Sequence, residues 1–326
     1  MASFNENVKN VVSLSEEASI RFDRQIRVWG AEAQARIQAS HVLICGLRGL
    51  HPEVIKNIVL AGVSITIQDD NNVDYNDLAS NFFLNINDIG SKITTSSLSR
   101  IRSLNNFATV NEELKSLHEL SDDFFNQFPV IMMCNDNDEE QILRVSNLCR
   151  QKNSIFFTSI AFGEEGFFFQ DFGTNFNYKD DPPNNKDVKT LSFHPYEYMI
   201  KKKWSELITR LSPINTTFVK SRLLVNFRKV YGKLPMPDDY DKVNAMAITM
   251  LKENNIEDEK FLTSLNLKEL CNTSIGAPVM LCSVLGSFLG QQVIKAVSLS
   301  GHPGNQIFVF SCHDYVTKAI HLPGAN

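Results

Sequence analysis

Residues 41–62 constrain the fold more than any other part of the 326-residue chain. They read HVLICGLRGLHPEVIKNIVLAG: a short β-branched run, a turn with two glycines, and a helical pattern that ends at Gly62. A buried strand, a glycine turn and a helix form the opening unit of a doubly wound sheet. We therefore expect an α/β fold with a Rossmann-like, mostly parallel sheet.

The following sequence continues this alternation of strands and helices. Strands are expected at 64–68, near 109–114, at 129–134 and at 154–160, with helices at about 92–104 and 139–152. Such alternation predicts a parallel sheet. An earlier helical pattern runs from Phe22 to Ile37. The aromatic segment 166–173 is predicted to pair antiparallel. An apolar helix over 277–297 is expected before a final strand at 306–311.

A change in composition near residues 178–189 suggests a boundary. This stretch is rich in Asn, Asp, Pro and Lys, and the charged sequence after it has a helical pattern. We expect four segments: a flexible N-terminus (1–18), a Rossmann-like domain (19–177), a helical insertion (178–265) and a return to the first domain (266–326).

Charge and cysteine usage exclude several classes of function. The net charge of −5 gives no broad basic field, so we expect neither nucleic-acid nor membrane binding. The six cysteines form no C-x-x-C pair and no histidine pair accompanies them, so no metal site is predicted. The N-terminus lacks a secretory pattern, and the apolar run 276–289 is shorter than a membrane span. We expect a soluble intracellular protein.

The glycine loop after the first strand is the first candidate site. A glycine turn at a helix N-terminus can hold a phosphate, and an acid about 20 residues further on can bind a ribose. Arg48 and His51 carry bulky side chains at positions where a bound phosphate would have to lie close to the backbone. One of them could itself contact phosphate, but we expect a closed, degenerate site formed by Gly46, Arg48, Gly49, His51 and Asp69.

The segment FDRQIRVWG (22–30) is the second candidate site. It is compatible with an amphipathic helix whose arginines are solvated. A less favoured reading is that Arg24 or Arg27 reaches a phosphate held by a partner, because a guanidinium is planar, always charged and able to bridge two oxygens. The residue types alone leave both readings open.

Together these motifs resemble the ubiquitin-like-protein activating enzymes, which are built on the adenylating fold of the bacterial MoeB and ThiF proteins. The resemblance includes FDRQIRVWG, the glycine loop, FFLNINDIGSK (82–92) and the apolar helix near the C-terminus. It covers most of residues 20–321, is weakest over 178–265, and is strongest to the smaller, non-catalytic subunits of the heterodimers that activate SUMO.

The resemblance implies that ATP and Mg are bound by the partner subunit and not by this chain alone. Of the family's ATP-binding residues, only the first acid is retained, as Asp69. The second acid falls at Asn71, the arginine at Ser80 and the lysine near Ile93, next to Lys92; a possible Asp-Asn step is present at 136–137. The Rossmann-like domain is then a pseudo-adenylation domain.

The same resemblance implies an obligate heterodimer with the large catalytic subunit, which acts on SUMO in the nucleus and cytoplasm. This chain would be inactive alone and would contribute Arg24 in trans to ATP on its partner, with Arg27 as the second choice. Two alternatives are a self-sufficient homodimeric enzyme of the MoeB/ThiF type and, from the fold alone, a nicotinamide-dependent dehydrogenase.

Overall fold

The computed structural model describes residues 14–134, 138–180, 187–207, 213–312 and 316–320. Its centre is an eight-stranded sheet of order β10-β9-β6-β5-β4-β1-β2-β3. The strands are β1 (His41–Cys45), β2 (Ser64–Gln68), β3 (Val110–Glu113), β4 (Val130–Cys134), β5 (Ile155–Phe162), β6 (Glu165–Asp171), β9 (Ile307–Ser311) and β10 (Val316–Ile320). Strands β5, β4, β1, β2 and β3 run parallel, as the sequence predicts.

The other three strands extend the sheet in antiparallel pairing. Strand β6 pairs with β5 and with β9, which confirms the antiparallel prediction for the aromatic segment. The expected strand at 306–311 is present as β9, but it is not the last, because β10 returns antiparallel along it. A separate hairpin joins β7 (Phe176–Lys179) to β8 (Val188–Leu191).

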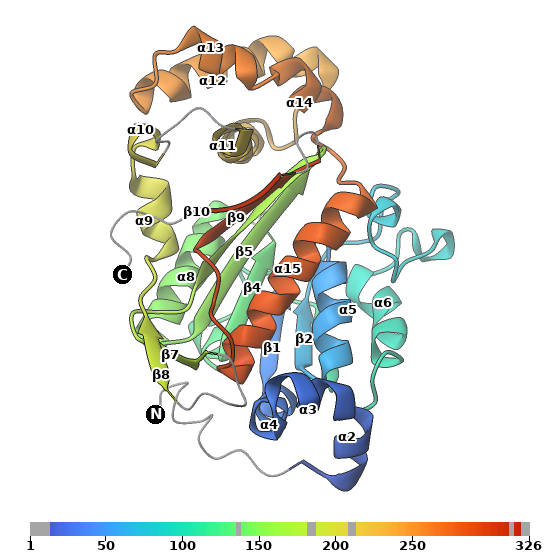
Figure 1. Cartoon of the computed structure of the whole chain (residues 1–326). Coiled ribbons are helices and arrows are strands. Elements are labelled where there is room, and N and C mark those ends of the chain that lie inside the picture. The colour runs from blue at the N-terminus through green and yellow to red at the C-terminus, as the bar shows by residue number, and fades with distance from the viewer. Residues whose placement is uncertain (1–13, 135–137, 181–186, 208–212, 313–315, 321–326) are drawn as a thin grey trace.

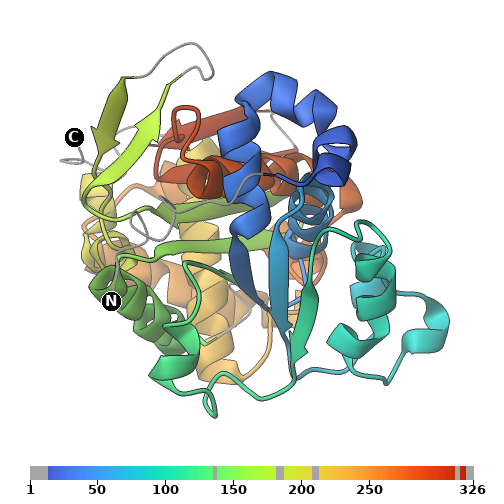
Figure 2. The same ribbon diagram turned by 90° about the horizontal axis from the view of Figure 1, so that it is seen from below.

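Helices cover both faces of the sheet (Figures 1 and 2). One face carries α4 (Ala31–Ala39), α5 (His51–Ala61), α6 (Ile93–Arg102) and α15 (Val279–Ser298), with α2 (Glu16–Arg21) and α3 (Asp23–Trp29) at one end. The other carries α7 (Asp122–Phe125), α8 (Glu139–Lys152), α9 (Tyr196–Lys201), α10 (Trp204–Leu207) and α11 (Pro213–Tyr231). Helices α12 (Tyr240–Glu253), α13 (Glu259–Ser264) and α14 (Leu267–Thr273) lie beyond α11.

Side chains along each strand point alternately to the two faces of the sheet, and each face carries its own hydrophobic core. In β1, Val42 and Ile44 face the core under α5 and α15, whereas Leu43 and Cys45 face the core under α8 and α11. Successive side chains of a strand point to opposite faces, so an apolar run of this kind is buried on both sides. The sheet is therefore the middle layer of three.

The helical pattern expected from Phe22 to Ile37 is divided at Gly30. This glycine has φ 90°, a conformation that side chains rarely adopt, and it ends α3 before α4 begins. At the other expected boundaries, residue 18 lies inside α2 and residue 178 lies inside β7. The segment after 178 thus opens with a hairpin, and its helices continue to α14.

Helix α11 is part of the main structure rather than a detachable unit. Its residues Phe218, Leu223 and Phe227 are buried in the same core as strands β6 and β9. Two buried ion pairs attach it to the rest of the chain: Lys220 with Glu165 and Arg222 with Glu139. Removal of α11 would expose one face of the sheet.

Helix α15 is the most apolar helix described. It is long and apolar enough to span a membrane by length and composition alone. In this fold it lies along the sheet and beside α5, with Leu281, Leu285, Leu289 and Val293 fully buried. The protein core therefore accounts for its apolar residues.

A glycine loop filled by its own side chains

The loop between β1 and α5 has the backbone of an anion-binding turn. Gly46 and Gly49 both have positive φ, at 89° and 58°. The Gly46 amide donates to the Gln68 carbonyl of the neighbouring strand at 2.8 Å. The chain then enters α5, whose first turn points toward the end of the sheet where nucleotides bind in this fold class.

Asp69, the predicted ribose acid, faces the loop instead of open space. Its Oδ2 accepts the Leu47 amide at 2.8 Å, and its Oδ1 accepts the backbone and side-chain amides of Asn71 at 2.9 and 2.7 Å. The side chain is buried. Its two oxygens thus hold together the ends of β1 and β2.

Arg48 occupies the space beside the loop with a bidentate ion pair. Its Nε and Nη2 donate to the two oxygens of Asp77 at 2.7 and 3.1 Å. The Asp77 carboxylate is buried, with 5% of its side chain exposed. A planar guanidinium matches a carboxylate in this geometry, so the Arg48 charge is balanced within the chain.

His51 fills the space beneath the first turn of α5. It is fully buried, and its Nδ1 lies 2.6 Å from the Gly46 carbonyl oxygen. A carbonyl only accepts, so Nδ1 carries the proton and Nε2 accepts from the Ser159 hydroxyl at 3.3 Å. The histidine thus cross-links the loop to β5.

A cavity of about 190 Å³ remains beside the loop. It is bounded by the loop, by the segment 74–81 and by the linker into α15; its charged lining residues are Arg48, Asp74, Asp77 and Arg228. Small-molecule sites usually measure about 300–1,000 Å³. The cavity is small for a nucleotide, and its two positive charges are matched by two negative ones.

The positions aligned with the family's other ATP-binding residues also have internal roles. Ile93 is fully buried in the core. The neighbouring Lys92 donates its ammonium group to the Asp70 carbonyl. The possible Asp-Asn step at 136–137 lies outside the described residues.

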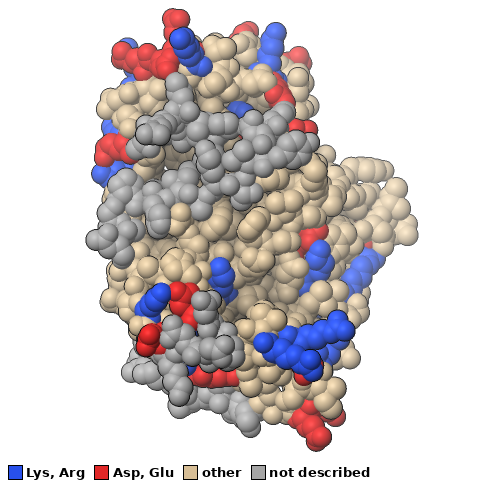
Figure 3. Space-filling view, in the orientation of Figure 1, with Lys and Arg blue, Asp and Glu red and all other residues tan. Residues whose placement is uncertain are grey.

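Helix α3 lies near the C-terminal end of α5, at the opposite end from the glycine loop, and its arginines are exposed to solvent. Arg24 is exposed and makes no hydrogen bond or ion pair with the described residues. Arg27 is also exposed, but it forms an ion pair with Asp23 at 2.8 Å. Figure 3 shows Lys and Arg side chains gathered over α2 and α3. These two helices carry the exposed Arg21, Arg24 and Arg27. Of the two predicted arginines, only Arg27 has an ion-pair partner among the described residues.

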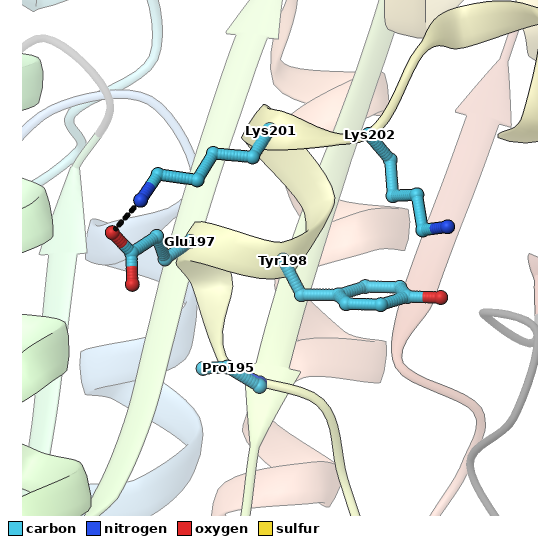
Figure 4. Close-up of a pocket in the computed structure, with 5 residues that line it drawn as sticks. All are labelled: Pro195, Glu197, Tyr198, Lys201 and Lys202. Carbon is cyan, nitrogen blue, oxygen red and sulfur yellow. Dashed lines mark ion pairs between the residues drawn. The ribbon is translucent and has the colours of Figure 1, made fainter.

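A surface depression beside α9 was not indicated by any sequence motif (Figure 4). It is lined by Pro195, Glu197, Tyr198, Lys201 and Lys202. Lys201 pairs with Glu197, and Lys202 pairs with Glu206 at 2.7 Å while lying over the Tyr198 ring. Each lysine charge is balanced nearby, so the depression has no excess charge to select an anion.

The described residues hold no cluster of three or more His, Cys, Asp or Glu side chains that could bind a metal. All six cysteines are buried free thiols. Burial raises the pKa of the Cys282 thiol to about 12, and it also raises the pKa of Cys45 and Cys149. A catalytic thiol needs the opposite, a lowered pKa and access to solvent.

The mostly parallel sheet and the glycine loop between β1 and α5 place this chain among proteins with a Rossmann-like fold. The model of the ThiF family matches residues 22–320, and the chain belongs to that family. The resemblance to the adenylating-fold enzymes drawn from its motifs is thereby confirmed.

Curated relatives match along nearly the whole chain. SUMO-activating enzyme subunit 1 of Xenopus laevis is 30% identical over 330 residues, which cover 93% of this chain and 95% of the relative. The human protein of the same name is 29% identical and covers 91% of this chain and 93% of its own length. The Dictyostelium discoideum protein of that name is also 29% identical, with 95% and 94% covered.

Proposed function

We propose that this chain is the smaller, non-catalytic subunit of a heterodimeric, ATP-dependent SUMO-activating enzyme. The observation that carries the proposal is a match over more than nine-tenths of both chains to relatives named SUMO-activating enzyme subunit 1. The occupied β1–α5 loop supports the non-catalytic role, because Arg48, His51 and Asp69 use their polar groups within the chain. A self-sufficient homodimeric enzyme is not favoured.

In this proposal the large subunit binds ATP, Mg and the C-terminal glycine of SUMO. Adenylation joins the modifier's terminal carboxylate to the α-phosphate of ATP and releases pyrophosphate. A cysteine thiolate of the large subunit then attacks the acyl carbon, which breaks the acyl–phosphate bond, releases AMP and forms a thioester. This chain supplies Arg24 across the interface. A guanidinium there would offset the negative charge that develops on the leaving pyrophosphate.

The face formed by α5 and α15 is the surface we propose for the large subunit. Figure 3 shows few charged side chains over the middle of this face. Val279 and Met280 at the start of α15 are half exposed, at 50% and 51%, and Leu60 of α5 is 38% exposed. Obligate interfaces are large and apolar, so this face fits a permanent partner.

A calorimetric titration with ATP and Mg tests the division of roles. We expect no measurable ATP binding by this chain alone at physiological concentrations, and one site for each heterodimer once the large subunit is added. Micromolar binding by the isolated chain would contradict the proposal and favour the homodimeric alternative. A chain that stays monomeric beside the large subunit in gel filtration would contradict the heterodimer.

We also propose, from the same likeness, that the heterodimer works in the nucleus and the cytoplasm. Fluorescence microscopy of a tagged full-length chain tests this. Confinement to a membrane-bounded organelle other than the nucleus would contradict it.

A further inference from the structure

One buried amide connects the helix that carries Arg24 to the helix that follows the glycine loop. Gln34, in the first turn of α4, is fully buried. Its Oε1 accepts the indole N–H of Trp29, the last residue of α3, at 2.9 Å. Its Nε2 donates to the carbonyl of Ala61, the last residue of α5, at 2.9 Å.

The end of α5 is shaped to receive this contact. The last carbonyls of a helix have no partner within it, and Gln34 supplies one to Ala61. The next residue, Gly62, has φ 103° and ends the helix. A side chain at Gly62 would lie 3.1 Å from the ring of Phe22 and 3.6 Å from the Gln34 amide nitrogen.

The same corner therefore holds α3 at both of its ends. Phe22, which precedes α3, is buried against Gly62 and meets Phe107 edge to face at 5.7 Å. Trp29 at the other end is held through Gln34. Arg24 lies between these two attachments and is exposed.

We propose that Gln34 is a positioning residue for Arg24, a role that rests on the function proposed above. The Gln34 amide sets the direction of α3, and α3 in turn aims the guanidinium at the partner's ATP. Without Gln34, the Trp29 end of α3 keeps its packing against the core but loses its hydrogen bond, so this end of the helix can shift. A displacement of about 1 Å in a reacting group can cost about 10²-fold in rate, so a small shift has a large effect.

The test measures ATP–pyrophosphate exchange by the complex of this chain with the large subunit. Three single variants are compared: Gln34→Met, which keeps side-chain length without hydrogen bonds, Trp29→Phe, which removes only the indole N–H, and Arg24→Ala. We expect Gln34→Met and Trp29→Phe to lower kcat by roughly 10-fold with the KM for SUMO unchanged. In the Arg24→Ala background, neither change should lower kcat further, because both act through the Arg24 guanidinium, which is already absent.

Gln68→Met is the matched control. Gln68 is also a buried glutamine that donates to a backbone carbonyl at 2.9 Å, that of Lys115, but it has no contact with α3. We expect kcat within about twofold of wild type for this variant, because its lost hydrogen bond lies at the Lys115 carbonyl and distant sites act independently. If Gln34→Met does not assemble, Trp29→Phe carries the test.

The outcomes separate the two proposals. If Arg24→Ala slows exchange but Gln34→Met and Trp29→Phe do not, the positioning role is wrong and the proposed function stands. If the effects of Gln34→Met and Arg24→Ala multiply, Gln34 acts by another route and the inference is also wrong. If Arg24→Ala has no effect in an intact complex, the in-trans role of Arg24 fails, and this inference fails with it.

Discussion

Single residues determine what the loop between β1 and α5 can bind. Arg48 forms an ion pair with Asp77, and the His51 ring lies between Gly46 and Ser159. Both side chains are thus committed to contacts within the chain. The backbone of an anion-binding turn is thus present, while the polar side chains beside it are paired within the chain.

Arg48→Ala should destabilise the fold. It leaves the buried Asp77 carboxylate without its guanidinium, and a buried charge that loses its partner costs several kcal/mol. Arg48 is 27% exposed, so we expect a smaller loss of about 2 kcal/mol in the free energy of unfolding, measured by urea denaturation. The double variant Arg48→Ala/Asp77→Asn should recover part of that loss. Equal stability of wild type and Arg48→Ala would contradict this account of the ion pair.

Arg24→Ala should slow adenylation without disturbing assembly. Arg24 is exposed and makes no hydrogen bond or ion pair with the described residues, so its removal leaves none of their buried groups unpaired. We expect ATP–pyrophosphate exchange by the heterodimer to fall by about 10-fold to 10³-fold, as for other lost charge-stabilising groups. Arg21→Ala, which removes an exposed arginine from the preceding helix, is the control and should have a smaller effect. Exchange at the wild-type rate in an intact Arg24→Ala complex would remove Arg24 from the active site.

At the scale of elements, close contact between α5 and α15 forms one outer layer of the molecule. Gly286 of α15 lies against Glu53 and the Leu50 carbonyl, and Gly290 lies against Asn57. Ser283 donates to the Glu53 carboxylate at 2.8 Å. The small residues that the sequence places along α15 are therefore the points at which the two helices touch.

Gly286→Ala should weaken this contact, whereas Gly276→Ala should not. A Cβ at Gly286 would lie 2.8 Å from the Glu53 Cβ and 3.0 Å from the Leu50 carbonyl oxygen, so the helices must separate. Overpacking of this kind costs about 1–3 kcal/mol, partly offset by alanine's better helix propensity. A Cβ at Gly276 meets nothing within 4 Å. Thermal unfolding of both variants measures the difference, and equal midpoints would show that α15 can shift at no cost.

At the scale of the whole molecule, the sheet joins two cores that have no common side chains. Trp29 lies against the core under α5 and α15, and Trp204 is buried in the core under α8 and α11. The same strands supply both cores through alternate residues. Loss of one core should therefore unfold the other.

A substitution in one core should accordingly lower the stability of both. Phe227→Ala in α11 removes a buried ring, a change that costs about 3–5 kcal/mol. In Trp204→Phe and Trp29→Phe backgrounds, the remaining tryptophan reports on one core each. We expect Phe227→Ala to lower the unfolding midpoint seen by either tryptophan by the same amount, coincident with far-UV circular dichroism. A lower unfolding midpoint for the Trp204 signal than for the Trp29 signal would show that the α11 layer unfolds independently.

Several parts of this protein depend only on neighbouring residues and could be predicted before the structure was known. Alternation and glycine placement predicted the parallel strands, the β1–α5 loop and the apolar helix, because these patterns repeat within a few positions. Tertiary structure decided the contacts between distant positions. Asp77 meets Arg48 across 29 residues, and Gln34 reaches Ala61 across 27. No local pattern marks such partners, because burial and direction are set only when the sheet brings the segments together.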